Sequence, residues 1–394
     1  MKVLLLCSSH NDLGLIRALI KLGCEIVVTG NVENLPGQKF ADKFIKADYS
    51  DRELILDIAR REKIDRIVPC CHDFALYTSA YVAEKLNLPG MDSLENVLTI
   101  HNKDRFKNLA FDLEIRTPKS HGFNNFSDAE NFLSTAKYPM IMKPVDSAGG
   151  RGVNRADDFN SAKKFLPQAF QESKSGRIVI EPYLTGSQHG FCTFLIDQKV
   201  RAICSNNEHS FENPWRVEID TFPSTNFNQV KDYLVESIEK IAQTLKLKDG
   251  IFHLQYIMQN GEPWIIETMR RILGNMYFIP GNALTGIDWE YWETRARLDL
   301  SLKDFPTHVK QEGYFSYKTI LANRNGRIKK IDLRGQFQKN LFDEFWVRLP
   351  GDEITNFNSQ PVGFLFSMFR TRGEMNRALI ENYRSDFVEM EVQS

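Results

Sequence analysis

The chain has 394 residues, of which 42% are hydrophobic and 26% are charged, so it can bury a large core and is long enough for two to three domains. Fifty basic residues nearly balance 51 acidic ones, which gives a formal net charge of -1. This balance gives no global electrostatic reason to expect a nucleic acid or an anionic membrane as a partner, although local phosphate sites stay open.

No apolar run in the sequence is long enough to span a bilayer, and the run at the amino end is too short for a secretory signal. A cytoplasmic protein without a membrane partner is therefore expected. The six cysteines show neither Cys-x-x-Cys pairing nor zinc-ligand spacing, which favours buried free thiols. They are Cys7, Cys24, Cys70, Cys71, Cys192 and Cys204.

The amino-terminal part is expected to form a small doubly wound sheet. Its predicted elements are strands at 3–6, 25–29 and 64–69 and helices at 12–22 and 52–61. Ligands of such sheets lie beyond the carboxyl ends of the strands, so the segments after Leu6 and Pro69 form a candidate substrate cleft, with ordinary loop polarity as the alternative. The polar residues of these segments include Ser8, Ser9, His72 and Asp73.

A predicted strand at 140–144 ends in a lysine and precedes a glycine-rich loop. Lys143 can meet a phosphate as a point charge, while Gly149 and Gly150 let backbone N–H groups approach phosphate oxygens without an intervening Cβ. The loop lacks the Gly-Lys-Ser/Thr ending of a Walker-type P-loop and the context of a dinucleotide fingerprint. Taken alone, such a loop is more often an ordinary turn than a nucleotide-binding loop.

A second apolar strand follows at 177–184, and its order after the lysine and the glycine loop suits an ATP site. The backbone around Glu181 and Leu184, with Pro182 and Tyr183 between them, is expected to offer an unpaired strand edge that hydrogen-bonds to the purine.

Farther along the chain, Asn260-Gly261 separates two apolar runs and predicts a β-hairpin. Gln255 and Glu267 should then lie across from each other, where a metal ion could bind between them. A helix is predicted from 229 to 245, another begins at Asp288, and the chain closes with a strand at 313–320, a turn at 325–326 and a helix at 372–383. Trp289 and Trp292 could line a pocket, but aromatic residues at this spacing more often pack in a core.

In this order the motifs resemble the ATP-grasp superfamily, whose members share a lysine before a glycine loop, an adenine-binding strand and an acidic hairpin that ends in arginine. The resemblance extends upstream to Asn102–Phe106, which looks like the first phosphate-contacting lysine at a helix start, and downstream to a segment like that of biotin carboxylase. It implies an α/β (α+β) ATP-grasp fold. The implied domains are a doubly wound pre-ATP-grasp domain at 1–115, a small lid subdomain at 116–184, a large subdomain with the metal site at 185–310 and a β-rich closing segment at 311–394.

The resemblance also implies roles for the residues of the phosphate site. Lys103 and Lys143 would hold the α- and β-phosphates, while Ser147, Gly149 and Gly150 would cover the β- and γ-phosphates when the loop closes. A solvated first turn of a helix is the alternative for Lys103. Arg151 is either a phosphate ligand or an exposed loop charge.

Two positions depart from the family pattern. Gln188 stands where a glutamate usually binds the ribose hydroxyls, so ribose contact is weaker or the nucleotide preference is altered. Met269 stands where an asparagine usually ligates magnesium, so Gln255, Glu267, phosphate oxygens and water would have to hold the ion. His209 resembles a histidine near the phosphates of related carboxylases, with a surface loop histidine as the alternative.

Arg271 falls where the family arginine lies beside the transferred phosphoryl group, and Arg270 is an added cation. Adjacent residues on a strand point to opposite faces, so one arginine should face the site and the other should pair structurally or reach an acidic substrate. Arg271 is the favoured catalytic residue, together with Lys143.

The resemblance implies an ADP-forming ligase that uses ATP and magnesium to join a carboxylate to an amine through an acyl phosphate. The ending Glu267–Asn275 looks most like ligases thought to act in amino-acid ligation or glycan decoration, so an amino acid or small amine joined to a sugar acid or another amino acid is the hypothesis. A bicarbonate-activating carboxylase and a nucleotide-binding module with little turnover are the alternatives. Relatives with this tail are often dimers, which makes a homodimer one option.

Overall fold

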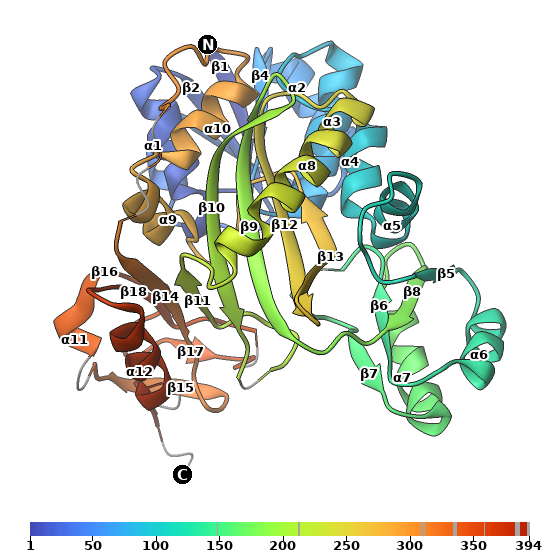
Figure 1. Cartoon of the computed structure of the whole chain (residues 1–394). Helices are drawn as coiled ribbons and strands as arrows, with labels where there is room; N and C mark the ends of the chain where they lie inside the picture. The colour runs from blue at the N-terminus through green and yellow to red at the C-terminus, as the bar shows by residue number, and fades with distance from the viewer. Residues whose placement is uncertain are drawn as a thin grey trace. The chain divides into compact units, whose positions relative to one another are not determined.

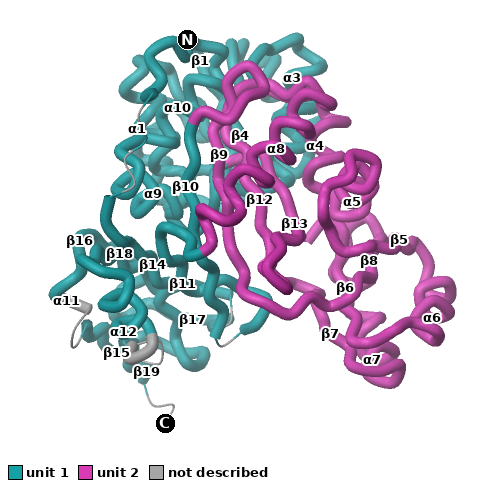
Figure 2. The backbone as a smooth tube through the Cα atoms, viewed as in Figure 1, with its two compact units in different colours: residues 1–90, 202–225, 272–394 teal, residues 91–201, 226–271 magenta. Residues whose placement is uncertain are grey.

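The computed structural model describes residues 1–147, 149–211, 213–307, 309, 312–333, 337–357, 359–382 and 387–391. The chain divides into two compact units, coloured separately in Figure 2. Unit 1 comprises residues 1–90, 202–225 and 272–394, and unit 2 comprises residues 91–201 and 226–271.

Unit 1 opens with a four-stranded parallel sheet in the order β3-β2-β1-β4, as the doubly wound prediction requires (Figure 1). The apolar run of β1 is fully buried from Val3 to Leu6. Strand β3 was not predicted, because it has only two apolar residues, and these lie between two lysines. The elements are β1 Lys2–Leu6, η1 His10–Asp12, α1 Leu13–Lys21, β2 Glu25–Gly30, η2 Gln38–Phe40, β3 Lys43–Lys46, α2 Arg52–Glu62, β4 Arg66–Pro69 and α3 Asp73–Leu86.

The rest of unit 1 contains antiparallel strands paired in the order β11-β14-β18-β16 and a small sheet in the order β17-β15-β19. Trp289 is fully buried, and its indole donates to the Thr285 hydroxyl at 3.0 Å. It therefore packs in the core and does not line a pocket. Of the predicted closing helix, Tyr383 lies outside the described residues. The elements are β10 Lys199–His209, which begins at the unit boundary, β11 Ile219–Phe222, α9 Phe278–Thr285, α10 Trp289–Arg297, β14 Tyr314–Ile320, β15 Gly326–Ile331, α11 Phe337–Asn340, β16 Leu341–Trp346, β17 Glu353–Ile354, β18 Gly363–Phe369, α12 Arg372–Asn382 and β19 Val388–Met390.

Unit 2 contains two sheets, one in the order β5-β8-β6-β7 and the other in the order β9-β12-β13. Helices α6 and α7 pack their apolar residues, including Leu133 and Leu166, against β6 and β8 of the first sheet. The elements are α4 Leu94–His101, α5 Lys103–Asp112, β5 His121–Phe123, α6 Phe126–Thr135, β6 Met140–Pro144, β7 Asn154–Ala156, α7 Phe159–Gln171, β8 Ile178–Pro182, β9 Ser187–Ile196, α8 Phe227–Leu245, β12 Gly250–Gln259 and β13 Glu262–Met269.

Strands β12 and β13 form the predicted hairpin. Asn260 and Gly261 have φ angles of 54° and 80°, as a type I′ turn requires of its two central residues. Gln255 pairs with Glu267 across the hairpin, as predicted. Strand β13 ends at Met269, so Arg270 and Arg271 lie just beyond the strand on which they were predicted.

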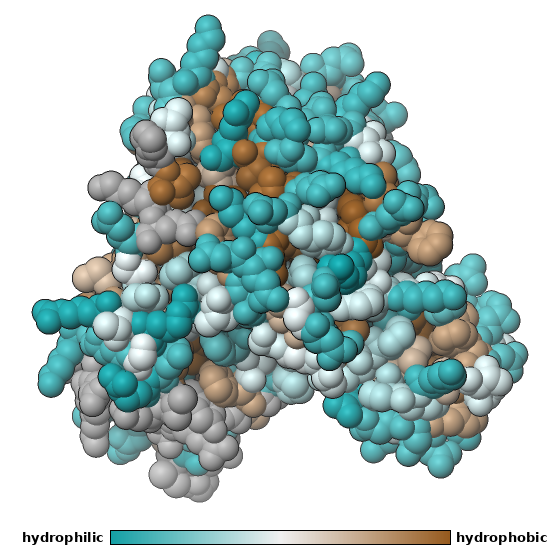
Figure 3. All heavy atoms as spheres, viewed as in Figure 1, coloured by the Kyte–Doolittle hydropathy of each residue, from teal (hydrophilic) through white to brown (hydrophobic). Residues whose placement is uncertain are grey.

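Large hydrophobic side chains are exposed at scattered positions, from Met1 to Met368, and Figure 3 shows hydrophobic residues among hydrophilic ones on the face drawn. Such scattered exposure is usual on protein surfaces. Among the residues that the structure describes, none of the helices combines the length and the apolar content needed to cross a membrane.

Candidate functional site: a lysine and glutamate cluster in unit 2

Three lysines and two glutamates form a charged cluster in unit 2, in which Lys103, Lys107 and Glu181 are buried and the other two are partly exposed. Helix α5 carries Lys103 and Lys107 one turn apart, so both side chains leave the same face of the helix. Lys103 Nζ lies 2.8 Å from Glu267 Oε1 on β13. Lys143 Nζ on β6 lies 3.0 Å from Glu181 Oε2 on β8, and Lys107 Nζ lies 3.6 Å from Glu181 Oε1. Three ammonium groups and two carboxylates leave the cluster with a net positive charge, which suits an anionic ligand.

Burial and charge act against each other at these groups. Burial alone would raise the pKa of Glu181, which is 1% exposed, but the ammonium groups of Lys107 and Lys143 bring it below its usual value. Burial lowers the pKa of Lys107 to about 8, although Glu181 partly offsets this effect. Lys107 also donates to the Thr117 hydroxyl at 2.6 Å and to the Ile265 carbonyl at 3.0 Å.

Lys107 was absent from the predicted site. Its signal in the sequence was its place one helical turn after Lys103, on a helix that was already assigned to phosphate binding. Lys103 itself is 8% exposed, so its side chain is buried rather than solvated at the helix start.

The glycine-rich loop follows β6 and has the backbone conformation that glycine makes accessible. Gly149, Gly150 and Gly152 have φ angles of 69°, 75° and 71°, which are unfavourable for residues with a Cβ. The Ser147 carbonyl accepts a hydrogen bond from Lys103 Nζ at 3.2 Å, which places the start of the loop beside the cluster. Arg151 is exposed.

Strand β8 is paired on both sides over its first three residues. It lies between β5 and β6, with Ile180 opposite His121 and Glu181 opposite Ile141. Pairing with β5 stops at Ile180, so the backbone from Glu181 to Leu184, where the purine contact was predicted, lies beyond that pairing. The purine contact stays a prediction.

The two predicted metal ligands are direct cross-strand neighbours, Gln255 on β12 and Glu267 on β13. Both offer the hard oxygen donors that magnesium prefers, so the pair fits a magnesium ion. Met269 lies two residues after Glu267 and therefore on the same face of the strand. Its thioether adds no suitable donor there.

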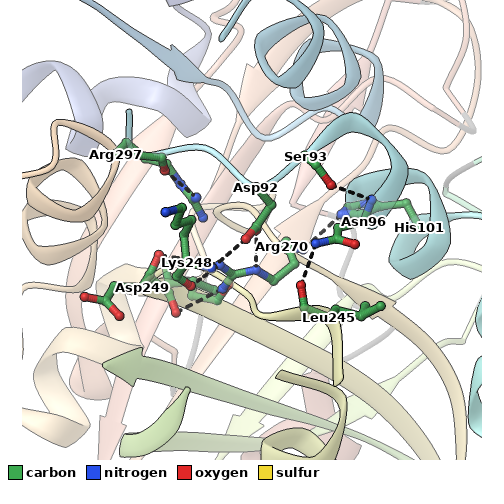
Figure 4. Close-up of polar contacts among 12 residues, drawn as sticks. Asp92, Ser93, Asn96, His101, Leu245, Lys248, Asp249, Arg270 and Arg297 are labelled. Carbon is green, nitrogen blue, oxygen red and sulfur yellow. Dashed lines mark hydrogen bonds and ion pairs between the residues drawn. The ribbon is translucent and has the colours of Figure 1, made fainter. Parts of the chain in front are cut away.

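Arg270 is a fully buried structural residue (Figure 4). Its Nε donates to Asp92 Oδ2 at 3.0 Å, and its backbone N–H donates to His101 Nε2 at 2.9 Å. The guanidinium also donates to the backbone carbonyls of Lys248, Asp249, Gly250 and Ile251. Arg270 therefore holds the beginning of β12 to the segment before α4.

Arg271 is 7% exposed and close enough to His253 to affect its titration. Burial first, and the charge of Arg271 second, lower the pKa of His253 to about 3, so this imidazole is neutral at ordinary pH. His253 pairs with Met269 at the end of the hairpin.

The other predicted residues lie in several places. Gln188 is on β9 of unit 2, opposite Ile257. His209 is in unit 1, where its Nε2 lies 3.1 Å from the Thr221 hydroxyl and its ring stacks on Phe211.

Residues 101–213 match the family model described as the ATP-grasp (A) domain of phosphoribosylglycinamide synthetase. The matched segment contains Lys103, Lys143, the glycine loop and Glu181. The chain has the ATP-grasp fold. This fold is the one that the order of the motifs predicted.

Solved structures agree along the whole chain. The L-amino acid ligase from Bacillus licheniformis superposes with a TM-score of 0.83 and 20% identity, covering 100% of this chain and 99% of that one. Phosphoribosylglycinamide synthetase from Anaerococcus prevotii gives a TM-score of 0.77 at 17% identity, with the same coverage of 100% and 99%. The biotin carboxylase domain dimer of the Hydrogenobacter thermophilus 2-oxoglutarate carboxylase, in complex with MgADP, gives 0.78 at 19%, covering 99% and 90%.

Among curated proteins, the carbamoyl phosphate synthase large chain of Clostridium botulinum strain Langeland is 24% identical over 267 residues. This match covers 65% of the ATP-grasp chain and 24% of the synthase. The chain therefore spans about a quarter of the length of the curated relatives it matches.

Proposed function

We propose that this ATP-grasp protein is an ADP-forming ligase that joins a carboxylate to an amine with ATP. The observation that carries the proposal is the charged cluster, in which Lys103 and Lys143 are each held by a glutamate beside a glycine loop. Cations fixed in a water-poor site can stabilise phosphate charge without rearranging during the reaction. The match to an ATP-grasp domain supports this assignment. It is also supported by the structural similarity to a ligase, a synthetase and a biotin carboxylase domain.

The proposed reaction has two steps. A carboxylate oxygen of the first substrate attacks the γ-phosphorus of ATP, and the bond from that phosphorus to the bridging oxygen of ADP breaks. The amine nitrogen of the second substrate then attacks the acyl carbon of the acyl phosphate, inorganic phosphate leaves, and the amine loses a proton. No side chain is needed as a nucleophile, so the work of the protein is alignment and charge stabilisation.

In this proposal the chain's residues act on the phosphates. Lys103 and Lys143 bind the α- and β-phosphates, and the backbone N–H groups of Ser147, Gly149 and Gly150 cover the β- and γ-phosphates. Arg271 stabilises the charge that develops during both transfers. Arg270 is excluded from this role because Asp92 and the backbone carbonyls already use its guanidinium.

Gln255 and Glu267 would hold magnesium, which, when bound, neutralises charge on the phosphate oxygens. Gln188 is assigned to the ribose, and the backbone around Glu181 and Leu184, with Pro182 and Tyr183 between them, to the purine. Arg151 remains a candidate phosphate contact from the exposed loop.

For the substrates, the similarity of the whole chain to an L-amino acid ligase favours an amino acid as the amine and a second amino acid as the carboxylate. A sugar acid is kept as an alternative carboxylate. Since the biotin carboxylase neighbour is a dimer, a homodimer is included in the proposal, and sedimentation of the purified chain tests it.

The test is release of ADP and phosphate from Mg-ATP across pairs of carboxylates and amines, with amide products identified by mass spectrometry. Release that needs both substrates and disappears in Arg271→Ala supports the ligase. Release that needs only bicarbonate would replace it with the carboxylase. ATP binding without cleavage under every condition would replace it with the nucleotide-binding module, which Gln188 and Met269 motivate.

A further inference from the structure

A second cluster of reactive side chains lies in unit 1, at the carboxyl edge of the parallel sheet. The Sγ atoms of Cys7 and Cys70 and a carboxylate oxygen of Asp12 all lie within 4.8 Å of one another. Cys7 is 6% exposed, while Cys70 and Asp12 are fully buried. The proposed ligase reaction uses none of these three residues.

Strand order explains how residues so distant in sequence meet. Strands β1 and β4 are parallel neighbours whose last pair is Leu6 with Pro69, so Cys7 and Cys70 are the next residues on the two strands. Asp12 comes from the 3-10 turn that precedes α1. The sequence showed no zinc-ligand spacing because this proximity depends on the strand order β2-β1-β4, which spacing alone does not reveal.

Asp12 is held in place by neutral donors only. Its Oδ2 accepts from the backbone N–H of Ser9 at 2.8 Å and from the Ser9 hydroxyl at 2.7 Å, and its Oδ1 accepts from the backbone N–H of Cys71 at 3.2 Å. Within the part of the chain that the structure describes, no lysine or arginine forms an ion pair with it. A fully buried carboxylate normally has a cationic partner, and Oδ1 retains a lone pair to accept one.

Two further features of the backbone mark this cluster. Helix α1 starts at Leu13 and helix α3 starts at Asp73, so two helix amino termini lie next to the loops that carry these residues. The positive end of a helix dipole stabilises a nearby thiolate. Cys7 also has a φ of 85°, a left-handed conformation that is uncommon for a residue with a Cβ and is found most often at functional sites.

We propose that Cys7, Cys70 and Asp12 form a binding site for a divalent cation of the zinc class. Two thiolates and one carboxylate oxygen are ligands that zinc accepts in tetrahedral sites, and three protein ligands leave one position for water or another molecule. Magnesium and calcium are excluded from this site because they require oxygen ligands. None of the residues assigned to the phosphates is a ligand of this site, so cation binding can be tested separately from the ligase reaction.

The test uses the full chain, reduced and treated with a chelator, then titrated with cobalt(II) and with cadmium(II). The expected result is one equivalent bound, with sulfur-to-metal charge-transfer absorption. Cys7→Ser and Cys70→Ser should each weaken binding at least tenfold and reduce the absorption. Asp12→Asn should weaken binding while keeping the thiolate signal. The matched control is Cys24→Ser, in the same unit but outside the cluster, which should behave like the wild type.

A measurement on the unmodified chain removes dependence on the folding of the variants. Native mass spectrometry of the reduced, unmodified chain with added zinc should show one bound ion. Absence of a stoichiometric thiolate signal would overturn the proposal, as would a signal that persists when both Cys7 and Cys70 are replaced. A disulfide between Cys7 and Cys70 that forms with peroxide, in a chain that binds no metal when reduced, would also overturn it.

Discussion

Lys107 Nζ lies 3.6 Å from Glu181 Oε1, and the two side chains are 3% and 1% exposed. This buried pair is the innermost part of the charged cluster, and Lys143 shares the same carboxylate. Glu181 therefore forms ion pairs with two lysines at once. Removing one of them therefore still leaves the carboxylate a cationic partner.

Replacing Lys143 with methionine should weaken ATP binding about 10- to 100-fold, since a hydrogen bond to a charged group contributes about 1.5 to 3 kcal/mol. The fold should survive because Lys107 still faces Glu181. Calorimetric titration with ATP measures the change. The control is Lys164→Met, which removes an exposed lysine of the same unit and should leave the affinity unchanged. Equal affinities in both variants would contradict a phosphate role for Lys143.

The two adjacent arginines should differ in what they support. Arg270→Ala leaves Asp92 buried without its cation, which should lower the free energy of unfolding by about 3 to 5 kcal/mol in urea denaturation. Arg271→Ala should instead slow ADP release about 10²- to 10³-fold, as loss of a donor to developing charge does elsewhere, with little change in the urea midpoint. A folded Arg271→Ala variant that turns over normally would remove Arg271 from the reaction.

ATP binding should weaken as the pH rises through about 8. Burial lowers the pKa of Lys107 to about 8, so this group is an ammonium below that pH and neutral above it. A bound polyanion favours the ammonium and raises this pKa, so binding above pH 8 takes up a proton and its affinity falls with increasing pH. Titrations in buffers of different ionisation enthalpy should detect that proton. Lys107→Met should bind ATP more weakly and lose this pH dependence. If the pH profile of ATP binding is unchanged by the substitution, Lys107 is not the group that takes up the proton.

Met269→Asn should lower the magnesium concentration needed for half-maximal ADP release, by several-fold. Asparagine would add an oxygen ligand on the face of β13 that carries Glu267, where the thioether offers none. Met269→Leu is the matched control and should behave like the wild type. If asparagine leaves the magnesium requirement unchanged, this end of the hairpin does not contact the ion.

Local sequence signals predicted those parts of the fold that depend on neighbours in the chain. The Asn260-Gly261 turn sets the register of its hairpin as far as Tyr256 and Ile265. A β-bulge between Gln255 and Tyr256 then shifts the register by one residue and brings Gln255 opposite Glu267, and the turn alone does not reveal this shift. The parallel sheet of the amino-terminal part could be predicted because short apolar strands take turns with helical patterns along the sequence. The position of β8 inside its sheet could not be predicted, since its neighbour β5 has only three residues.

The charged cluster and the cysteine cluster both contain contacts that could not be predicted from the sequence. Lys103 and Lys143 were found through motifs, but Lys107 belongs to no motif and acquires its place only when α5 packs on the strands. Cys7 and Cys70 meet because two strands are neighbours in a sheet. Contacts that arise from tertiary packing have no fixed spacing in the sequence.

The ion pair between Lys103 and Glu267 has a consequence for the order of ligand binding. Lys103 Nζ and an oxygen of the proposed metal ligand Glu267 lie 2.8 Å apart. In the proposed enzyme, a phosphate that binds Lys103 must replace the carboxylate of Glu267 as the partner of this lysine. Binding is then an exchange of anions, and it frees an oxygen of Glu267 for magnesium at the moment the phosphate arrives. Metal and nucleotide should accordingly enter together, and neither should bind tightly alone.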